Sequence, residues 1–300
     1  MSKQELYNIG REALRKLTGG EDVGYVCPVC LNNFLELQDL SEEHVPPDSV
    51  GGKVLCLTCR KCNSEAGYQI DAHVHREQLS HSFMEKNGQT RRATLIKGEI
   101  QLNVDVRNDQ KGIQIQILGE HNDPKVVEKS DSQILVDGTS FQLRDEVSYS
   151  RKMADVGYLK SAYLAAFAKL GYAYVLMHGL DRVRQQIRSP QSQLLEVFRL
   201  DAGSGDEIEK ALLLFQRPIH CLGVKMGKSI VCLPPPPPPF DRDGFYEKLQ
   251  EMRSASPGET WQIDGMIHWP ERFELALDFC GKYRIEVQRH FPADATRQGD

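Results

Sequence analysis

Two cysteine pairs constrain this 300-residue chain more than any other feature of its sequence. Cys27 and Cys30 form one Cys-x-x-Cys, Cys59 and Cys62 form a second, and 28 residues separate the pairs. Each such turn delivers two thiolates from one tight bend, and zinc takes four thiolates in a tetrahedron. A redox-active Cys-x-x-Cys needs only one pair in a βαβ context, which the sequence does not indicate. The spacing therefore predicts a structural zinc site.

The segment between the pairs contains side chains that a plain zinc knuckle does not need. Glu43 and His44 end a short polar run, and a Pro-Pro break and a Gly-Gly turn follow. An apolar stretch over 53–57 then leads through the second cysteine pair into a helix expected to begin near Asn63. The expected order is strand, loop, strand, helix. This order predicts that Glu43, His44 and Asn63 face one cleft.

This combination resembles the HNH (His-Asn-His) endonuclease family, whose core is called ββα-metal. The resemblance covers residues 22–75 and is carried by three motifs framed by the zinc cysteines: Glu43-His44-x-Pro46, Gly51-Gly52 and Cys59-x-x-Cys62-Asn63-x-x-x-Gly67. It implies that His44 is the general base that takes a proton from the attacking water. It also implies that Glu43 and Asn63 are ligands of a catalytic Mg²⁺ or Mn²⁺. The four cysteines match the structural zinc pairs of a subset of the family.

One position departs from the family pattern. The middle Asn of the family fixes the imidazole of the base, and the corresponding position here is near Val54, with no Asn close by. A backbone carbonyl or Thr58 is the expected replacement. This departure bears on the efficiency of the reaction more than on the identity of the site.

The chemistry of the candidate residues agrees with these roles. Phosphodiester hydrolysis needs an activated water and neutralisation of charge at the leaving oxygen. A histidine with an ordinary pKa of ~6.5 is suited to proton abstraction near neutral pH. Oxygen ligands suit magnesium or manganese, whereas thiolates suit zinc. The sequence therefore separates two metals by the type of their ligands.

Simpler interpretations exist for each candidate residue. His44 can be a surface histidine, and Glu43 can be solvated charge beside Glu42. Asn63 can be an N-cap, because Asn is a favoured capping residue. Asp71 lies eight residues beyond Asn63, about 12 Å along a helix. We therefore interpret Asp71 as a capping or packing residue.

Composition limits the class of protein. The chain is 40% hydrophobic and 26% charged, which is ordinary for a soluble globular protein with a sizeable core. Its formal net charge of −5 is unlike that of proteins that grip DNA through a broad basic surface, so nucleic-acid binding must use local patches or metals. The polar N-terminus does not resemble a signal peptide, and zinc thiolates suit a reducing, cytoplasmic location. The other four cysteines are expected to be buried free thiols: Cys56, Cys221, Cys232 and Cys280.

Pattern changes along the chain predict four regions. They are an N-terminal helix (1–20), the zinc and nuclease module (21–86), an antiparallel sheet plus helical hairpin (87–190) and a mixed region (191–300) with a polyproline run at 234–239. The helix over 2–18 is expected to pack against the zinc module. The polyproline run is expected to be a stiff spacer.

Residues 151–188 are expected to form the helical hairpin and to cover the preceding sheet. The apolar stretch over 158–177 is not expected to cross a membrane, because Lys160, Lys169 and Gly171 interrupt it. Three arginines at its exit, Arg182, Arg184 and Arg188, are either a phosphate-binding patch or solvated helix charge, and we favour the second interpretation.

These observations predict an α+β protein that acts as a metal-dependent endonuclease on nucleic acid, with DNA as the expected substrate. The family resemblance implies a setting in phage defence, restriction or a mobile element. A homodimer is expected if both strands of a duplex are cut, and a protein activator is the other open partner. The alternative is a catalytically silent, zinc-stabilised module that binds nucleic acid or protein.

Overall fold

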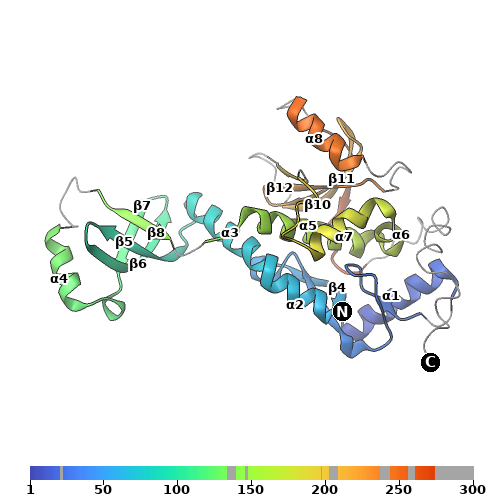
Figure 1. The fold of residues 1–300 in the computed structure, drawn as a ribbon, viewed down its shortest axis with the longest axis horizontal. Helices are drawn as coiled ribbons and strands as arrows, with labels where there is room; N and C mark the ends of the chain where they lie inside the picture. Colours follow the sequence, from blue (N-terminus) through green and yellow to red (C-terminus); the bar gives the residue numbers. More distant parts are fainter. Residues whose placement is uncertain are drawn as a thin grey trace. The chain divides into compact units, whose positions relative to one another are not determined.

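The chain is a mixed α+β protein whose sheets are antiparallel, as expected from its sequence (Figure 1). The computed structural model describes residues 1–20, 23–133, 140–145, 148–196, 198–202, 209–236, 244–255 and 261–273. Contacts within the chain divide it into two compact units, one formed by residues 1–74 and 152–300, the other by residues 75–151. This division crosses the region expected at 87–190, because its sheet and its helices belong to different units.

The first helix, α1 (Lys3–Thr18), forms where the sequence predicts it. Ser2 and Glu5 make a capping box, and Gly19 ends the helix in the left-handed conformation at φ 72°. Its apolar side enters the main core, and α1 contacts β1 (Tyr25–Val26). Tyr7 Oη donates a hydrogen bond to the carbonyl of Leu35 at 2.5 Å. The expected packing of this helix against the cysteine-containing segment is therefore confirmed.

Two short hairpins and a helix carry the segment between the cysteines. Strand β1 pairs with β2 (Asn33–Phe34), and β3 (Leu40–Val45) pairs with β4 (Lys53–Cys59). Short 3-10 helices, η1 (Leu37–Asp39) and η2 (Asp48–Val50), lie in the connections. The β3–β4 turn requires its two glycines, because Gly51 has φ 77° and a Cβ on Gly52 would lie 1.5 Å from the Pro46 carbonyl oxygen.

Helix α2 (Arg60–Ala66) follows β4 directly. Cys59 is its N-cap, so the helix begins three residues before Asn63. A π-helical turn (Gly67–Asp71) and α3 (Ala72–Met84) continue it. A π-turn changes the phase of the side chains along a helix.

Three helices fill the centre of the first unit. Gly171 ends α5 (Arg151–Leu170), and α6 (Tyr172–Val175), a 3-10 turn (His178–Leu180) and α7 (Asp181–Arg188) follow. The tyrosines Tyr163 and Tyr172 donate to the carbonyls of Pro28 and Val26, each at 2.6 Å. None of the described helices is long and apolar enough to span a membrane.

These helices were expected to share a core with the preceding sheet, but they belong to the core of the first unit. Helix α5 is buried along nearly its whole length and shares one core with α1 and the sheet that follows it in sequence. A helix that is apolar all round needs partners on several sides, and the preceding sheet has a separate core.

The sheet of the first unit has the order β13–β10–β11–β12–β9. Its strands are β9 (Arg199–Asp201), β10 (Lys210–Arg217), β11 (Cys221–Met226), β12 (Ser229–Leu233) and β13 (Gln262–His268), and α8 (Phe245–Ala255) joins the same core. The strands expected over 211–216, 223–226 and 229–233 are confirmed. The strand expected at 283–287, most of the one at 273–278, half of the proline run and Cys280 lie outside the described residues.

The second unit contains the predicted sheet with one buried face. Its order is β7 (Gly112–Ile117), β6 (Ile100–Asp109), β5 (Thr90–Lys97) and β8 (Gln142–Asp145). Strand β6 alternates between buried and more exposed residues, as a half-buried strand must. The buried residues pack with Val126 and Val127 of α4 (Pro124–Gln133), which follows a 3-10 turn (Gly119–His121). The strand expected at 134–136 lies outside the described residues.

Candidate metal centre and catalytic site

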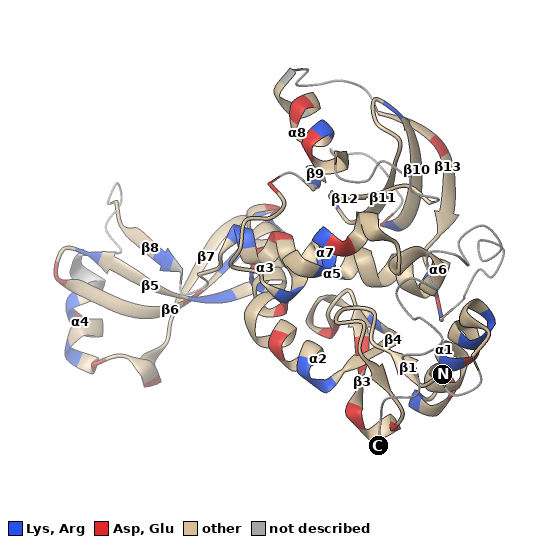
Figure 2. Ribbon diagram, turned by 45° about the vertical axis from the view of Figure 1, so that its right-hand side comes forward, with Lys and Arg blue, Asp and Glu red and all other residues tan. Residues whose placement is uncertain are grey.

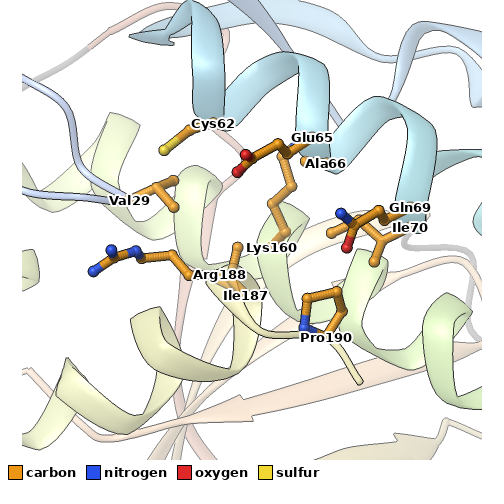
Figure 3. Close-up of a pocket in the computed structure, with 10 residues that line it drawn as sticks. All are labelled: Val29, Cys62, Glu65, Ala66, Gln69, Ile70, Lys160, Ile187, Arg188 and Pro190. Carbon is orange, nitrogen blue, oxygen red and sulfur yellow. The ribbon is translucent and has the colours of Figure 1, made fainter. Parts of the chain in front are cut away.

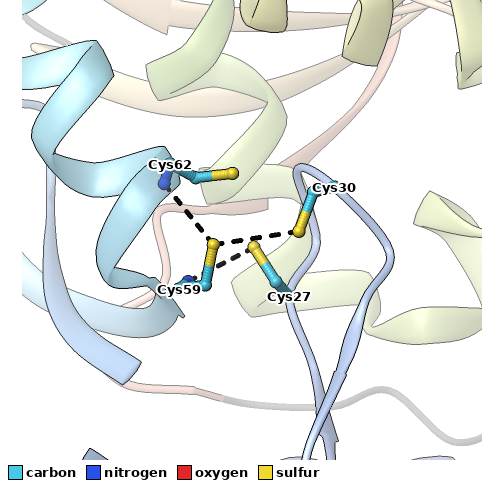
Figure 4. A group of neighbouring side chains, drawn as sticks. All are labelled: Cys27, Cys30, Cys59 and Cys62. Carbon is cyan, nitrogen blue, oxygen red and sulfur yellow. Dashed lines mark hydrogen bonds between the residues drawn. The ribbon is translucent and has the colours of Figure 1, made fainter. Parts of the chain in front are cut away.

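The four predicted zinc ligands form one cluster. The Sγ atoms of Cys27, Cys30, Cys59 and Cys62 all lie within 4.8 Å of one another (Figure 4). The distance from Cys30 Sγ to Cys59 Sγ is 3.8 Å. Four sulfurs at ~2.3 Å from a tetrahedral zinc would be about 3.8 Å apart. The cluster therefore fits a single structural metal ion such as zinc.

Backbone N–H groups and the neighbouring thiols act on the charge of the four sulfurs. The backbone N–H of Cys59 donates to Cys27 Sγ at 3.3 Å, and that of Cys62 donates to Cys59 Sγ at 3.4 Å. Hydrogen bonding by Cys27 lowers the pKa of Cys59 far below its usual range and that of Cys30 to about 7. Burial raises the pKa of Cys27, and against the lowering effect of Cys27 the thiols of Cys30 and Cys59 raise the pKa of Cys62. Thiolates are the form that binds a metal. Because Cys27 and Cys59 are buried, the cluster has the closed character of a structural site.

Glu43 points into the protein from β3. Its Oε1 lies 2.7 Å from Lys160 Nζ, and its Oε2 accepts a hydrogen bond from Thr58 Oγ1 at 2.8 Å. Lys160 Nζ also lies 2.8 Å from Asp71 Oδ2. In Figure 3, the Lys160 side chain extends from α5 toward the end of α2 that carries Glu65 and Ala66. Glu43 is therefore part of a buried cluster with one ammonium and two carboxylates.

Burial and charge act in opposite directions on these groups. Burial raises the pKa of Glu43, and the ammonium of Lys160 and the hydroxyl of Thr58 offset this only in part. Burial alone would lower the pKa of Lys160, but the carboxylates of Glu43 and Asp71 raise it above its usual range. The lysine is therefore held as an ammonium.

His44 follows Glu43 but lies in a different environment. Its side chain is 39% exposed, and its Nε2 is 3.9 Å from Asp48 Oδ1. Adjacent strand residues point to opposite faces, so Glu43 and His44 do not share an open cleft as expected. A register shift separates them, and His44 lies opposite Val54 on β4.

The structure shows which residues occupy the place of the family's middle Asn. Val54, at the expected position, has no polar side chain to orient the imidazole. Thr58, the expected replacement, donates to Glu43 instead. The described contact of the His44 imidazole is with Asp48, whose Oδ1 lies 3.9 Å from its Nε2 and which no sequence motif indicated.

Asn63 links α2 to β3. Its Nδ2 donates to the carbonyl oxygen of Glu42 at 2.9 Å. It does not cap α2, because Cys59 occupies the cap position. The helix therefore brings Asn63 to the backbone beside Glu43 and His44. The catalytic and metal-binding roles of these three residues remain predictions.

Sequence reasoning missed the partners of Glu43. In the sequence Lys160 only interrupts an apolar helix, although a lysine in such a helix signals a buried acidic partner. Asp71 was interpreted as a capping or packing residue, and its ion pair with Lys160 was not expected. The π-turn that ends at Asp71 changes its phase, so distance along a regular helix is a poor guide to its position.

The arginines near the end of α7 do not form a joint phosphate patch. Arg182 pairs with Glu247, and Arg184 is buried against Asp181 and the Val175 carbonyl. Arg188 alone of the three lines a groove beside the cysteine cluster. This arrangement does not support a phosphate patch, and the expected solvated helix charge is wrong for Arg184, which is buried and paired within the protein.

Thr58→Val is expected to destabilise the protein by about 1–3 kcal/mol, because Glu43 Oε2 would lose its buried donor. Thr58→Ser keeps the hydroxyl and is expected to have a smaller effect. The midpoints of urea unfolding measure both changes. If Thr58→Val were as stable as the wild type, the hydrogen bond would contribute nothing measurable.

Comparison with known proteins agrees with this geometry. Residues 27–79 match the family model described as HNH endonuclease, and the match includes all four cysteines. The resemblance that the sequence indicated is therefore confirmed for this segment, which carries an HNH endonuclease module. No curated protein and no solved structure matches the chain.

Proposed function

We propose that this protein is a nuclease whose HNH module hydrolyses phosphodiester bonds in DNA. The observation that carries the proposal is a partly exposed His44, on the β3–β4 hairpin that also carries Cys59 of the four-cysteine cluster, within the segment that matches HNH endonucleases. His44 takes a proton from the attacking water, and the Asp48 carboxylate lies 3.9 Å from its Nε2. The family resemblance suggests a setting in phage defence, restriction or a mobile element. Cutting of both strands would need two such sites, and therefore a homodimer.

Glu43 and Asn63 are the proposed ligands of a magnesium or manganese ion. When bound, such an ion supplies neutralisation of charge on the scissile phosphate. Asn63 suits this role, because its bond to Glu42 uses the amide nitrogen and leaves the oxygen as the atom for a cation. Glu43 suits it less well, because Lys160 and Thr58 already contact its two oxygens.

Two grooves support a nucleic-acid substrate. The first has a volume of about 760 Å³ and is lined by residues around the cysteine cluster. The second has a volume of about 720 Å³ and adjoins the tip of the β3–β4 hairpin. The second groove is lined by Lys53, Lys210, His268, Trp269 and Arg272, with Glu271 as its acidic residue. Cations can contact phosphates, and a tryptophan can stack on a base.

The second groove lies close to the proposed base along the chain. Its lining includes Val45 and Lys53, which pair across the hairpin next to the pair formed by His44 and Val54. Figure 2 shows acidic and basic residues interspersed along the helices and strands, in line with the net charge of −5. Local grooves of this kind are therefore where a phosphate backbone would bind.

Reversing two charges in this groove is expected to weaken DNA binding. In Lys53→Glu/Lys210→Glu, the dissociation constant for a DNA duplex should rise by more than tenfold at low salt, and the slope of log K against log salt should fall by about 2. Fluorescence anisotropy at several salt concentrations measures both. Lys16→Glu/Lys248→Glu makes the same change in net charge on α1 and α8 and should have little effect. Equal losses of DNA affinity in the two variants would show that DNA binds outside this groove.

The substrate is tested by incubating the purified protein with supercoiled plasmid and with an RNA transcript, in Mg²⁺, in Mn²⁺ and without either ion. The proposal expects nicked plasmid only when a divalent ion is present. Cleavage of RNA alone would keep the nuclease and change its substrate.

A second candidate function is a catalytically silent, zinc-stabilised module that binds nucleic acid or protein. The contact between Glu43 and Lys160 favours it, because that contact occupies the carboxylate a catalytic metal would need. Binding of DNA without cleavage under every metal condition would select this alternative.

A further inference from the structure

Lys160 stands where a metal ion would be expected between two acidic side chains. Its Nζ lies 2.7 Å from Glu43 Oε1 and 2.8 Å from Asp71 Oδ2. The side chains of Lys160, Glu43 and Asp71 are only 3%, 4% and 16% exposed. Carboxylate oxygens that converge on one point are the ligands that magnesium and manganese prefer. The ammonium therefore satisfies oxygens that could also hold a divalent ion.

The positive charge of Lys160 does not fully balance the cluster. Two carboxylates face one ammonium, and Asp71 Oδ1 is buried without a hydrogen-bond partner among the residues that the structure describes. A buried unpaired carboxylate oxygen is costly. A doubly charged ion would match the two carboxylates, whereas the lysine matches one of them.

The surroundings give Lys160 a place to move. Lys160 lines a pocket with Glu65 and Gln69 of the α2 segment and with Ile187 and Arg188 of α7 (Figure 3). Glu65 is an exposed carboxylate in this pocket. An ammonium that left Glu43 would therefore remain beside an acceptor and near solvent.

We propose that Glu43 and Asp71 form a divalent-cation site in which the Lys160 ammonium is the resident cation. Metal binding then requires Lys160 to withdraw, so the lysine controls whether Glu43 is available to a divalent ion. Lys160 is a positioning residue in this account, because it acts through Glu43. Any consequence for cleavage rests on the proposed function, whereas the exchange of cations does not.

Lys160→Met tests the exchange without an activity assay. Methionine has a similar length and no charge, so the two carboxylates would be left without a cation. The variant should bind Mn²⁺ at least tenfold more tightly than the wild type, measured by electron paramagnetic resonance of free Mn²⁺. Its melting temperature should rise with added Mn²⁺ more than that of the wild type. Glu43→Gln/Lys160→Met is the matched control and should lose the added affinity.

Equal Mn²⁺ affinity in the wild type and Lys160→Met would overturn the proposal, as would an increase that persists in the double variant. Zinc content and thermal unfolding establish that each variant is folded. If Lys160→Met does not fold, Asp71→Asn in the otherwise wild-type chain provides the second test. Asp71→Asn should lower the Mn²⁺ affinity of the wild type, and an unchanged affinity would exclude Asp71 as a ligand. Tight Mn²⁺ binding without any cleavage would contradict the nuclease and leave the cation exchange intact.

Discussion

Cys59→Ser is expected to remove the metal from the cysteine cluster and to destabilise the protein by several kcal/mol. Cys59 has two roles, because its sulfur lies 3.8 Å from Cys30 Sγ and also caps α2 by accepting the Cys62 N–H. Structural zinc contributes about 10–16 kcal/mol of apparent binding free energy in small zinc-dependent peptides. The large surrounding core retains part of the fold here, so we expect a loss of about 5 kcal/mol rather than complete unfolding.

Elemental analysis and thermal unfolding measure this prediction together. Cys56→Ala is the matched control, because Cys56 is a buried cysteine on the same strand and lies outside the cluster. It should keep the full metal content and lose only packing. A Cys59→Ser protein that still held one tightly bound zinc per chain would contradict the assigned ligand set.

His44→Ala is expected to slow DNA cleavage by about 10²–10⁴-fold, the usual contribution of a general base. The substitution should leave stability and zinc content nearly unchanged, because His44 is partly exposed and outside the cysteine cluster. The initial rate of plasmid nicking, at matched zinc content, measures the effect. Unchanged DNA affinity would show that the loss lies in the chemical step.

Two further variants test whether the loss of cleavage is specific to the His44 imidazole. Asp48→Asn keeps the imidazole but removes the carboxylate 3.9 Å from it, so a smaller loss is expected. His121→Ala changes an exposed histidine of the second unit and should not affect the rate. A His44→Ala protein that cuts as fast as His121→Ala would show that His44 is not the base.

The sequence predicted the features that depend on local chemistry. The spacing of the cysteines was sufficient to predict their cluster, because each Cys-x-x-Cys turn fixes two sulfurs within a few residues. The helical pattern over 2–18 similarly marked α1, and the period-two pattern marked β5 and β6. In each case the residues that determine the element are neighbours in sequence.

The sequence could not predict the features that depend on distant contacts. Lys160 reaches Glu43 from another helix, and neither residue shows a local pattern that names the other. Strand alternation could have placed Glu43 and His44 on opposite faces, but the polar run around them suggested that both were exposed. The sequence did not predict that Cys59 caps α2, because its sulfur was expected to bind zinc. These contacts decide whether Glu43 is available to a metal.

The most direct test of the proposed function is the nicking rate of zinc-loaded protein, free of other divalent ions, as Mg²⁺ or Mn²⁺ is added. Wild-type protein and His44→Ala are compared at equal zinc content. The proposed function predicts a wild-type rate that rises with the added ion and saturates, with little cleavage by the variant. Absence of cleavage by both proteins at every ion concentration, or equal cleavage by both, would contradict it.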